Sequence, residues 1–140
     1  MPARRPKTNK SDSELQDSMQ ALVGIFRNED DMTKGLAKLE ELKARAKNMR
    51  VEGSRMFNPG WHLARELKSL LLVSEAIALS ARERKESRGA HARIDYEKLD
   101  DEKWGKLNNI IVKDGDGLKL SQKPLPVMPD ELRQVLAEDQ

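Results

Sequence analysis

Apolar residues recur at α-helical spacing in two consecutive segments near the start of the chain, and only a very short break separates them. The first pattern predicts a helix over residues 13–28, with residues 11–13 offering capping side chains. The second predicts a helix over 31–50, capped by the acidic pair at 30–31. So short a connection forces the two helices into an antiparallel pair. The apolar positions are Leu15, Met19, Leu22, Val23 and Phe26, then Met32, Leu36, Leu39, Leu42, Ala46 and Met49.

A third segment, residues 59–87, is the longest and the most apolar. Asn58 is a suitable N-cap for it, and Pro59 suits the first helical position, where its missing N–H costs nothing. Apolar side chains cover more than half of this helix's circumference, so we expect it to be covered on more than one side. The run at residues 70–73 favours permanent docking, because an independent domain exposes little contiguous apolar surface. Gly89 is the predicted C-cap.

The chain changes character after Gly89, where polar residues without a sustained period replace the helical pattern. Two short apolar runs, residues 110–112 and 118–120, flank a glycine-containing turn and predict a β-hairpin. Pro124, Pro126 and Pro129 then enforce an extended stretch before a short helix over 130–138.

The expected fold class is therefore all-α. An antiparallel three-helix bundle occupies residues 13–89, and a C-terminal extension over 90–140, with the short hairpin and the short helix, packs on it. Residues 1–12 are expected to form a disordered basic tail. Four basic residues in the first ten contribute +4 to a net charge of +2, which leaves −2 for the remainder. A nucleic-acid domain would carry its basic excess on a folded face, so we predict no nucleic-acid partner and keep binding through the tail as an alternative.

Composition removes several classes of site. The 140 residues include no Cys, which excludes disulfides, thiolate metal sites, iron–sulfur clusters and cysteine nucleophiles. With His62 and His91 as the two histidines, we expect no metal site. No apolar run approaches the roughly 20 residues of a membrane span, and the first ten residues lack the apolar stretch of a signal peptide. We therefore expect no direct membrane insertion.

Two motifs resemble functional sites without meeting their requirements. Ser87, His91 and Asp95 stand at i, i+4 and i+8, a spacing that could mimic a nucleophile–base–orienter trio, but Gly89 interrupts it and no oxyanion donors accompany it. Asp114 opens a run similar to a calcium-binding loop, but positions 5 and 6 of that run are Leu and Lys, where an EF-hand needs an oxygen ligand and Gly. We predict no catalytic residue.

Two carboxylates, Glu66 and Glu75, interrupt the apolar third helix. If buried, each would need a cationic partner, such as Arg65 or Lys68 nearby or an Arg from elsewhere in the chain. We predict instead that both lie on the narrow polar edge of the helix.

The densest cluster of chemically versatile side chains lies in residues 84–96. Arginine forks can grip carboxylates or carbonyls of a facing surface, and a His and a Tyr can bond across it. On residue types alone, a solvated charged turn fits this segment as well as a docking site does. The residues to which these two alternatives apply are Glu86, Ser87, Arg88, Gly89, His91, Arg93 and Tyr96.

The same segment carries a family resemblance. The string Glu-Ser-Arg-Gly-Ala-His-Ala-Arg at residues 86–93, followed by Asp95-Tyr96, Asp100-Asp101 and Trp104, resembles the C-terminal region of succinate dehydrogenase and fumarate reductase flavoprotein subunits. Residues 15–27 and 35–42 are similar to the first two helices of that region. Residues 58–63 resemble the actinobacterial-type branch, and the similarity spans residues 13–138.

The resemblance implies a helical C-terminal domain without its own catalytic residues. It also implies that the segment at residues 86–93 is a docking or structural motif, which suits the arginine chemistry described above. In this family the FAD-binding domain, its glycine-rich loop and the substrate-binding residues lie upstream, and this chain has no G-x-G-x-x-G. The implied partners are the FAD-binding domain of the same subunit and the iron–sulfur subunit, with FAD in the parent subunit and no cofactor in this chain. The implied location is cytoplasmic, at the inner face of the membrane through the parent complex. The alternative is a free-standing helical protein-interaction domain.

Overall fold

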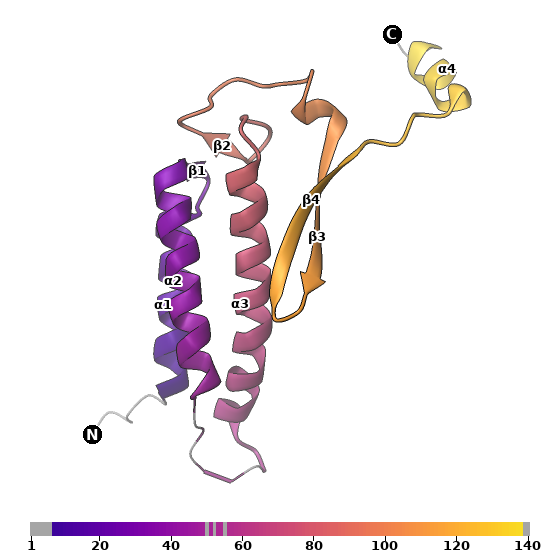
Figure 1. Ribbon diagram of the computed structural model, residues 1–140. Helices are drawn as coiled ribbons and strands as arrows, with labels where there is room; N and C mark the ends of the chain where they lie inside the picture. The colour runs from indigo at the N-terminus through magenta and orange to yellow at the C-terminus, as the bar shows by residue number, and fades with distance from the viewer. Residues whose placement is uncertain (1–6, 50, 52, 55, 139–140) are drawn as a thin grey trace.

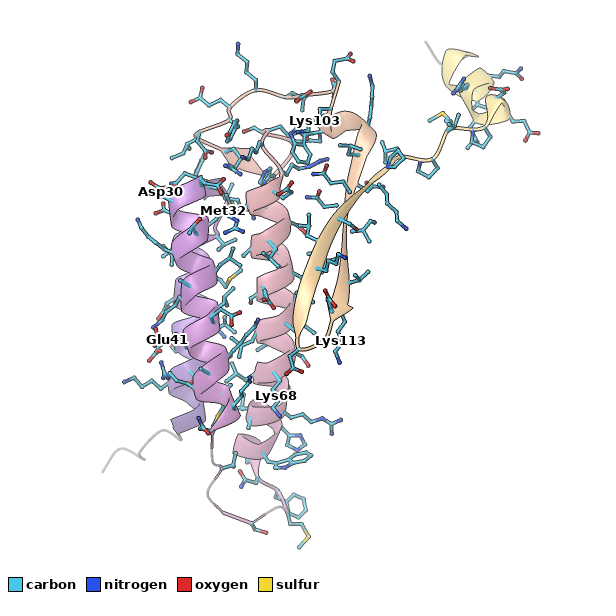
Figure 2. All side chains as sticks on the ribbon, viewed as in Figure 1. Asp30, Met32, Glu41, Lys68, Lys103 and Lys113 are labelled. Atoms are coloured by element: carbon cyan, nitrogen blue, oxygen red, sulfur yellow. The ribbon has the colours of Figure 1, made fainter. Side chains whose placement is uncertain are left out.

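Three helices form the body of the molecule in this computed structural model, which describes residues 7–49, 51, 53–54 and 56–138. α1 (Lys7–Leu22), α2 (Glu29–Lys47) and α3 (Pro59–Glu83) lie side by side with alternating directions (Figure 1). In Figure 2, Met32 points to the inner side of α2, where it is fully buried, whereas Glu41 projects from the outer side. The core cluster consists of Leu15, Val23, Leu39, Leu42, Leu67, Leu71 and Ala78.

The helix starts follow from their capping residues. The Asn28 side chain caps α2 by accepting the Asp31 N–H at 2.8 Å, two residues before the predicted cap. Three acidic residues in the first turn of α2 complement the positive end of its dipole. The cap predicted for α3 is confirmed, because the Asn58 side chain accepts from the Gly60 N–H at 3.0 Å and Pro59 occupies the first turn.

The ends of α1 and α3 differ from the predicted positions. α1 begins at Lys7, so residues 7–12 are helical, and residues 1–6 of the expected tail lie outside the described residues. Contacts from Ser11 and Glu14 to Arg45 of α2 give this part of the helix a tertiary partner. α3 ends at Glu83 with Arg84 as its C-cap, four residues before the predicted end.

The predicted all-α class is wrong, because the described residues contain two two-stranded sheets. β1 (Phe26–Arg27) pairs in parallel with β2 (Ala92–Arg93), and this pairing ends the first helical segment before residue 28. β3 (Leu107–Asp114) and β4 (Gly117–Pro124) form an antiparallel hairpin. The parallel pair joins strands 66 residues apart, in the register Phe26↔Ala92, so no local periodicity marks it.

The hairpin lies along α3, as Figure 1 shows, and the chain then leads to α4 (Asp130–Glu138) away from the bundle. Asn109 of β3 donates to the Ser80 carbonyl at 3.1 Å, and Gln122 of β4 donates to Glu83 at 3.0 Å. A short 3₁₀ helix (Trp104–Lys106) precedes the hairpin and buries Trp104. Within the described residues, no helix combines the length and apolar character that crossing a membrane requires.

A candidate docking motif at the end of the bundle

Glu86 is the buried anionic centre of the segment that follows α3. Its side chain is fully buried and accepts from Arg88 Nε at 3.0 Å, Arg88 Nη2 at 3.2 Å and the Asp100 N–H at 2.9 Å. Arg84 Nη1 lies 3.3 Å from the same carboxylate. Burial by itself raises the pKa of Glu86, but Arg88, the Asp100 amide and Arg84 outweigh it and hold that pKa below 4.5. Glu86 is therefore an ionised structural anchor.

Arg93 is the buried cationic centre beside it. Its side chain has no exposed surface, and its Nη1 donates to the carbonyls of Ala81, Arg82 and Arg84 at 3.0–3.3 Å. These carbonyls belong to the C-terminal end of α3, where the helix leaves its acceptors unsatisfied and its dipole is negative. Nε and Nη2 donate to the two oxygens of Asp95 at 2.6 and 2.7 Å. One guanidinium thus terminates α3 and holds the returning chain.

Asp95 extends this connection to the start of α2. Its Oδ2 accepts from the backbone N–H of Glu29 at 2.9 Å, at the positive end of that helix. The Glu29 side chain in turn accepts from Arg93 Nη2 at 3.2 Å. The hydrogen bonds from Arg93 are the largest influence on the Asp95 carboxyl. Together with the Glu29 amide they outweigh the effect of burial and lower the pKa of Asp95 to about 2. The pair joins the ends of two helices of opposite polarity.

Ser87 and Gly89 shape the backbone between these charges. The Ser87 hydroxyl donates to the Tyr96 carbonyl at 2.9 Å and accepts from the Arg93 N–H at 2.8 Å. Arg88 and His91 exchange backbone hydrogen bonds at 2.9 and 3.0 Å, closing a tight turn. Gly89 has φ +57° in this turn, so it is a turn residue and not the predicted helix cap.

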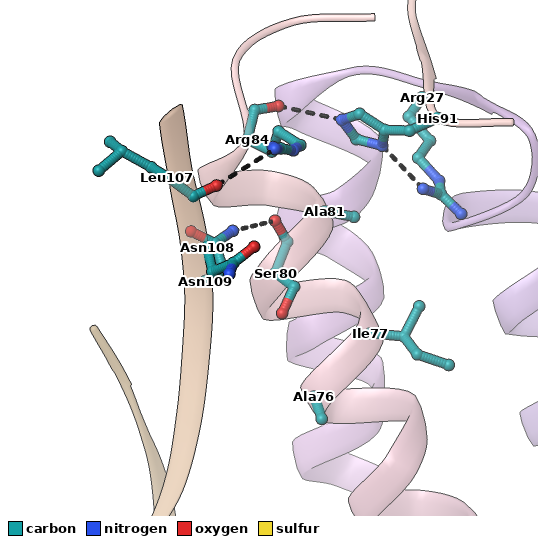
Figure 3. Close-up of a pocket in the computed structure, with 10 residues that line it drawn as sticks. All are labelled: Arg27, Ala76, Ile77, Ser80, Ala81, Arg84, His91, Leu107, Asn108 and Asn109. Atoms are coloured by element: carbon teal, nitrogen blue, oxygen red, sulfur yellow. Dashed lines mark hydrogen bonds between the residues drawn. The ribbon is translucent and has the colours of Figure 1, made fainter. Parts of the chain in front are cut away.

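His91 is held as a neutral ring. Its Nδ1 lies 2.8 Å from Arg27 Nη1, and because a guanidinium only donates, Nδ1 must accept. Nε2 then carries the proton and donates to the Arg84 carbonyl at 3.0 Å (Figure 3). Burial chiefly lowers the pKa of His91, and the charges of Arg27, Arg93 and Arg84 lower it further against the opposing Arg84 hydrogen bond.

All seven residues of the predicted motif meet in this one cluster. Tyr96 is 39% exposed and stacks under the Arg93 guanidinium, whose carbon lies 4.9 Å from the ring centroid. Ser87 and Asp95 both bind Arg93, through its backbone and its guanidinium respectively, whereas the His91 ring binds Arg27 and the Arg84 carbonyl. These contacts make the cluster a structural junction between the end of α3, the start of α2 and the returning chain.

Several partners of this junction were not predicted. Arg27 belongs to β1 and Glu29 is the first residue of α2, and pairing of β1 with β2 brings them to His91 and Arg93. Glu86 recruits Asp100 and, through Arg88, Asp101 at 2.6 Å. The two adjacent acidic residues Asp100 and Asp101, which follow an Arg-rich segment, were the available signal, whereas no local pattern marks Arg27.

Glu75 also differs from its prediction. It is 9% exposed in the middle of the bundle and pairs with Lys43 of α2 at 2.5 Å, so its partner comes from another helix and not from Arg65 or Lys68. Glu66 is exposed. Groups of three or more His, Cys, Asp or Glu side chains that could hold a metal ion do not occur among the residues described.

The exposed side of α3 is unusually apolar. Leu70, Val73 and Ile77 are 45%, 55% and 46% exposed, and their i, i+3, i+7 spacing places them on one face. Leu72 is 51% exposed on another side of the helix. The sequence prediction of a helix covered on several sides thus corresponds to an apolar surface that this chain by itself leaves open.

Comparisons with known proteins agree with this picture. Residues 12–134 match the family model "Fumarate reductase flavoprotein C-term". The succinate dehydrogenase flavoprotein subunit of Coxiella burnetii is 38% identical over 117 residues, covering 83% of this chain and 19% of the relative. The fumarate reductase flavoprotein subunit of Haemophilus influenzae is 37% identical over 124 residues, covering 85% and 21%.

Solved structures give the same result. A chain of Mycobacterium smegmatis Sdh1 in complex with UQ1 superposes with a TM-score of 0.85 at 40% identity, over 92% of this chain and 22% of that one. E. coli quinol fumarate reductase FrdA gives 0.79 at 33% identity, over 88% and 22%. The chain spans about a fifth of the length of the relatives it matches. It belongs to the family of C-terminal domains of succinate dehydrogenase and fumarate reductase flavoprotein subunits.

Proposed function

We propose that this chain supports an FAD-dependent enzyme that interconverts succinate and fumarate, by docking on the flavin-binding part of the same subunit. The observation that carries the proposal is the family match over residues 12–134 together with the open apolar face of α3. A helix that exposes Leu70, Val73 and Ile77 gains free energy when another surface removes them from water. The junction around Glu86 and Arg93 fixes the helix ends, so that face is presented in one orientation.

The described residues do not fit the flavin themselves. Dinucleotide sites place a pyrophosphate at a helix N-terminus that follows a parallel strand and a glycine-rich turn. The helix here that follows a parallel strand is α2, and its first turn carries Glu29, Asp30 and Asp31. Asp95 already accepts the Glu29 N–H. This end of α2 repels a phosphate, so FAD belongs to the remaining part of the subunit in this proposal.

The remaining partners follow from the same assignment. The iron–sulfur subunit would meet the flavoprotein subunit as a whole, and the complex would hold this domain at the inner face of the cell membrane without insertion of its own helices. The chain alone is expected neither to bind FAD nor to turn over succinate.

Reconstitution tests the proposal. The flavoprotein core is defined as the source organism's flavoprotein polypeptide, truncated before the region homologous to this chain. It is produced with and without the chain, and bound flavin absorbance and dye-linked succinate oxidation are measured. We expect the chain to bind the core and to raise flavin retention and activity, with no flavin band from the chain alone. Flavin bound by the chain alone would contradict the proposal. So would a flavoprotein core that neither binds the chain nor gains flavin retention or activity from it.

A further inference from the structure

Arg27 is a half-buried cation without a carboxylate partner in the described part of the chain. Its Nε donates to the Gly24 carbonyl at 2.6 Å and its Nη1 to His91 Nδ1 at 2.8 Å, and both acceptors are neutral. Burial alone lowers the pKa of Arg27. The other buried or half-buried arginines that the structure describes each have an acid within 4 Å: Arg82 with Glu29, Arg84 and Arg88 with Glu86, and Arg93 with Asp95.

The two bonds that Arg27 makes orient its guanidinium and leave donors over. An arginine has five N–H hydrogens, and these contacts use two, so about three stay available. The His91 ring is itself fixed by the Arg84 carbonyl at 3.0 Å, so the fork cannot swing freely. Such a pre-set fork matches the two oxygens of a carboxylate.

The surroundings of Arg27 are basic on one side and apolar on the other. Arg27, Arg84 and His91 line a groove of about 510 Å³ between α3 and β3 (Figure 3). None of the residues that line this groove is Asp or Glu. Ile77 lines it as well, which connects Arg27 to the stripe of Leu70, Val73 and Ile77 on α3. We call Arg27 together with Leu70, Val73 and Ile77 the Arg27 face.

We infer that the Arg27 face receives an Asp or Glu side chain carried on an apolar segment of the flavoprotein core. This inference rests on the proposed function, which supplies the occupant, since the chain spans about a fifth of its relatives and the rest of the subunit lies outside it. Charge complementarity selects the chemistry: an apolar segment alone would bury the Arg27 charge unpaired, and a basic one would add repulsion.

Binding of the chain to the flavoprotein core measures the contribution of Arg27. We expect Arg27→Gln to weaken binding by about tenfold or more, because a buried charge on the core loses its partner. The salt dependence of binding should also become shallower. Lys34→Gln removes the same charge from the outer side of α2, where Lys34 is 68% exposed, and should leave binding within about twofold. A thermal unfolding curve of each free variant separates loss of the contact from loss of the fold.

Cross-linking identifies the occupant even if Arg27→Gln also loosens the junction. Arg27→Lys keeps the charge and introduces an amine that a carbodiimide couples to a carboxylate in direct contact. We expect a new amide bond between the introduced lysine and one Asp or Glu of the core. The inference would be overturned if Arg27→Gln bound the core as tightly as the wild type does. It would also be overturned if the introduced lysine coupled only within the chain or between two copies of it. Either result would leave the proposed function standing. A core that does not bind the wild-type chain would overturn both.

Discussion

Arg93 and Asp95 form a two-bonded ion pair in which each partner also completes the end of a different helix. Arg93 binds the last carbonyls of α3, and Asp95 binds the first N–H of α2. A positive group therefore lies at the negative end of one helix dipole, and a negative group lies at the positive end of the other. Because both helices and the returning chain share this pair, it governs the geometry of the junction.

Loss of Arg93 should be among the most destabilising changes in the chain. Arg93→Leu leaves Asp95, Glu29 and the α3 carbonyls without their buried donor, so the free energy of unfolding should fall by about 3–5 kcal/mol. Arg93→Lys keeps the charge but loses the guanidinium fork, so its free energy of unfolding should lie between those of the wild type and Arg93→Leu. Urea unfolding monitored by circular dichroism measures both. Wild-type stability in Arg93→Leu would show that the junction does not hold the helices.

Protonation of His91 should loosen the same junction. Burial holds its pKa below 6.5 in the folded chain, whereas the unfolded chain titrates at the ordinary value. Stability from the neutral ring is thus fully present above pH 6.5 and is lost as pH falls through the folded pKa. The imidazole of His91 should titrate below 6.5 by NMR. His91→Gln should remove this part of the pH dependence of unfolding, and a His91 titration at or above 6.5 would disprove the assignment.

The turn at Gly89 should tolerate no side chain without a conformational cost. Its φ of +57° disfavours any Cβ, yet no atom lies within 4 Å of where that Cβ would stand. Gly89→Ala should therefore cost about 1–2 kcal/mol through backbone strain alone. Gly89→Asn should cost less, since Asn adopts this conformation more readily. Equal unfolding free energies for Gly89→Ala and the wild type would mean that the turn relaxes.

The buried pair between Lys43 and Glu75 should behave differently from an exposed one. Lys43→Met leaves Glu75 unpaired in the bundle, and the free energy of unfolding should fall by about 3 kcal/mol or more. Lys34→Met breaks the exposed contact with Asp31 and should change it by less than about 1 kcal/mol. Adding Glu75→Met to Lys43→Met should restore most of the loss. Equal free energies of unfolding for Lys43→Met and Lys34→Met would show that the buried pair contributes no more to stability than the exposed one.

Local patterns in the sequence identified what depends on local chemistry. The cap formed by Asn58 and Pro59 depends on neighbouring residues and was predicted correctly. The seven residues of the motif at 86–96 were named with the help of the family string, because on residue types alone a solvated charged turn fitted this segment equally well. The hairpin strands were recognised at residues 110–112 and 118–120, but β3 and β4 extend to Leu107 and Pro124, since polar ladder positions carry little signal.

Features that depend on remote pairing were missed. The parallel pairing of Phe26 with Ala92 ends α1 early and makes the all-α class wrong. Lys43 of α2 pairs with Glu75 of α3, and the apolar pattern of α3 alone does not indicate this partner. The sequence analysis therefore placed Glu75 on the polar edge of the helix. The partnership of Arg27 and His91 spans 64 residues and has no local counterpart. In each case the deciding contact joins segments that are far apart in the sequence, and no local pattern indicates that they lie close together in the fold.

The proposed function can be tested in source cells by affinity capture from cell fractions, with an antibody raised against the hairpin at residues 107–124. The captured material is analysed for polypeptide size, flavin absorbance and dye-linked succinate oxidation. We expect to recover the sequence of this chain together with flavin-binding and iron–sulfur polypeptide sequences, with a flavin spectrum and activity in the membrane fraction. Recovery of a 15.9 kDa chain without flavin, activity or flavoprotein peptides would contradict the proposed function.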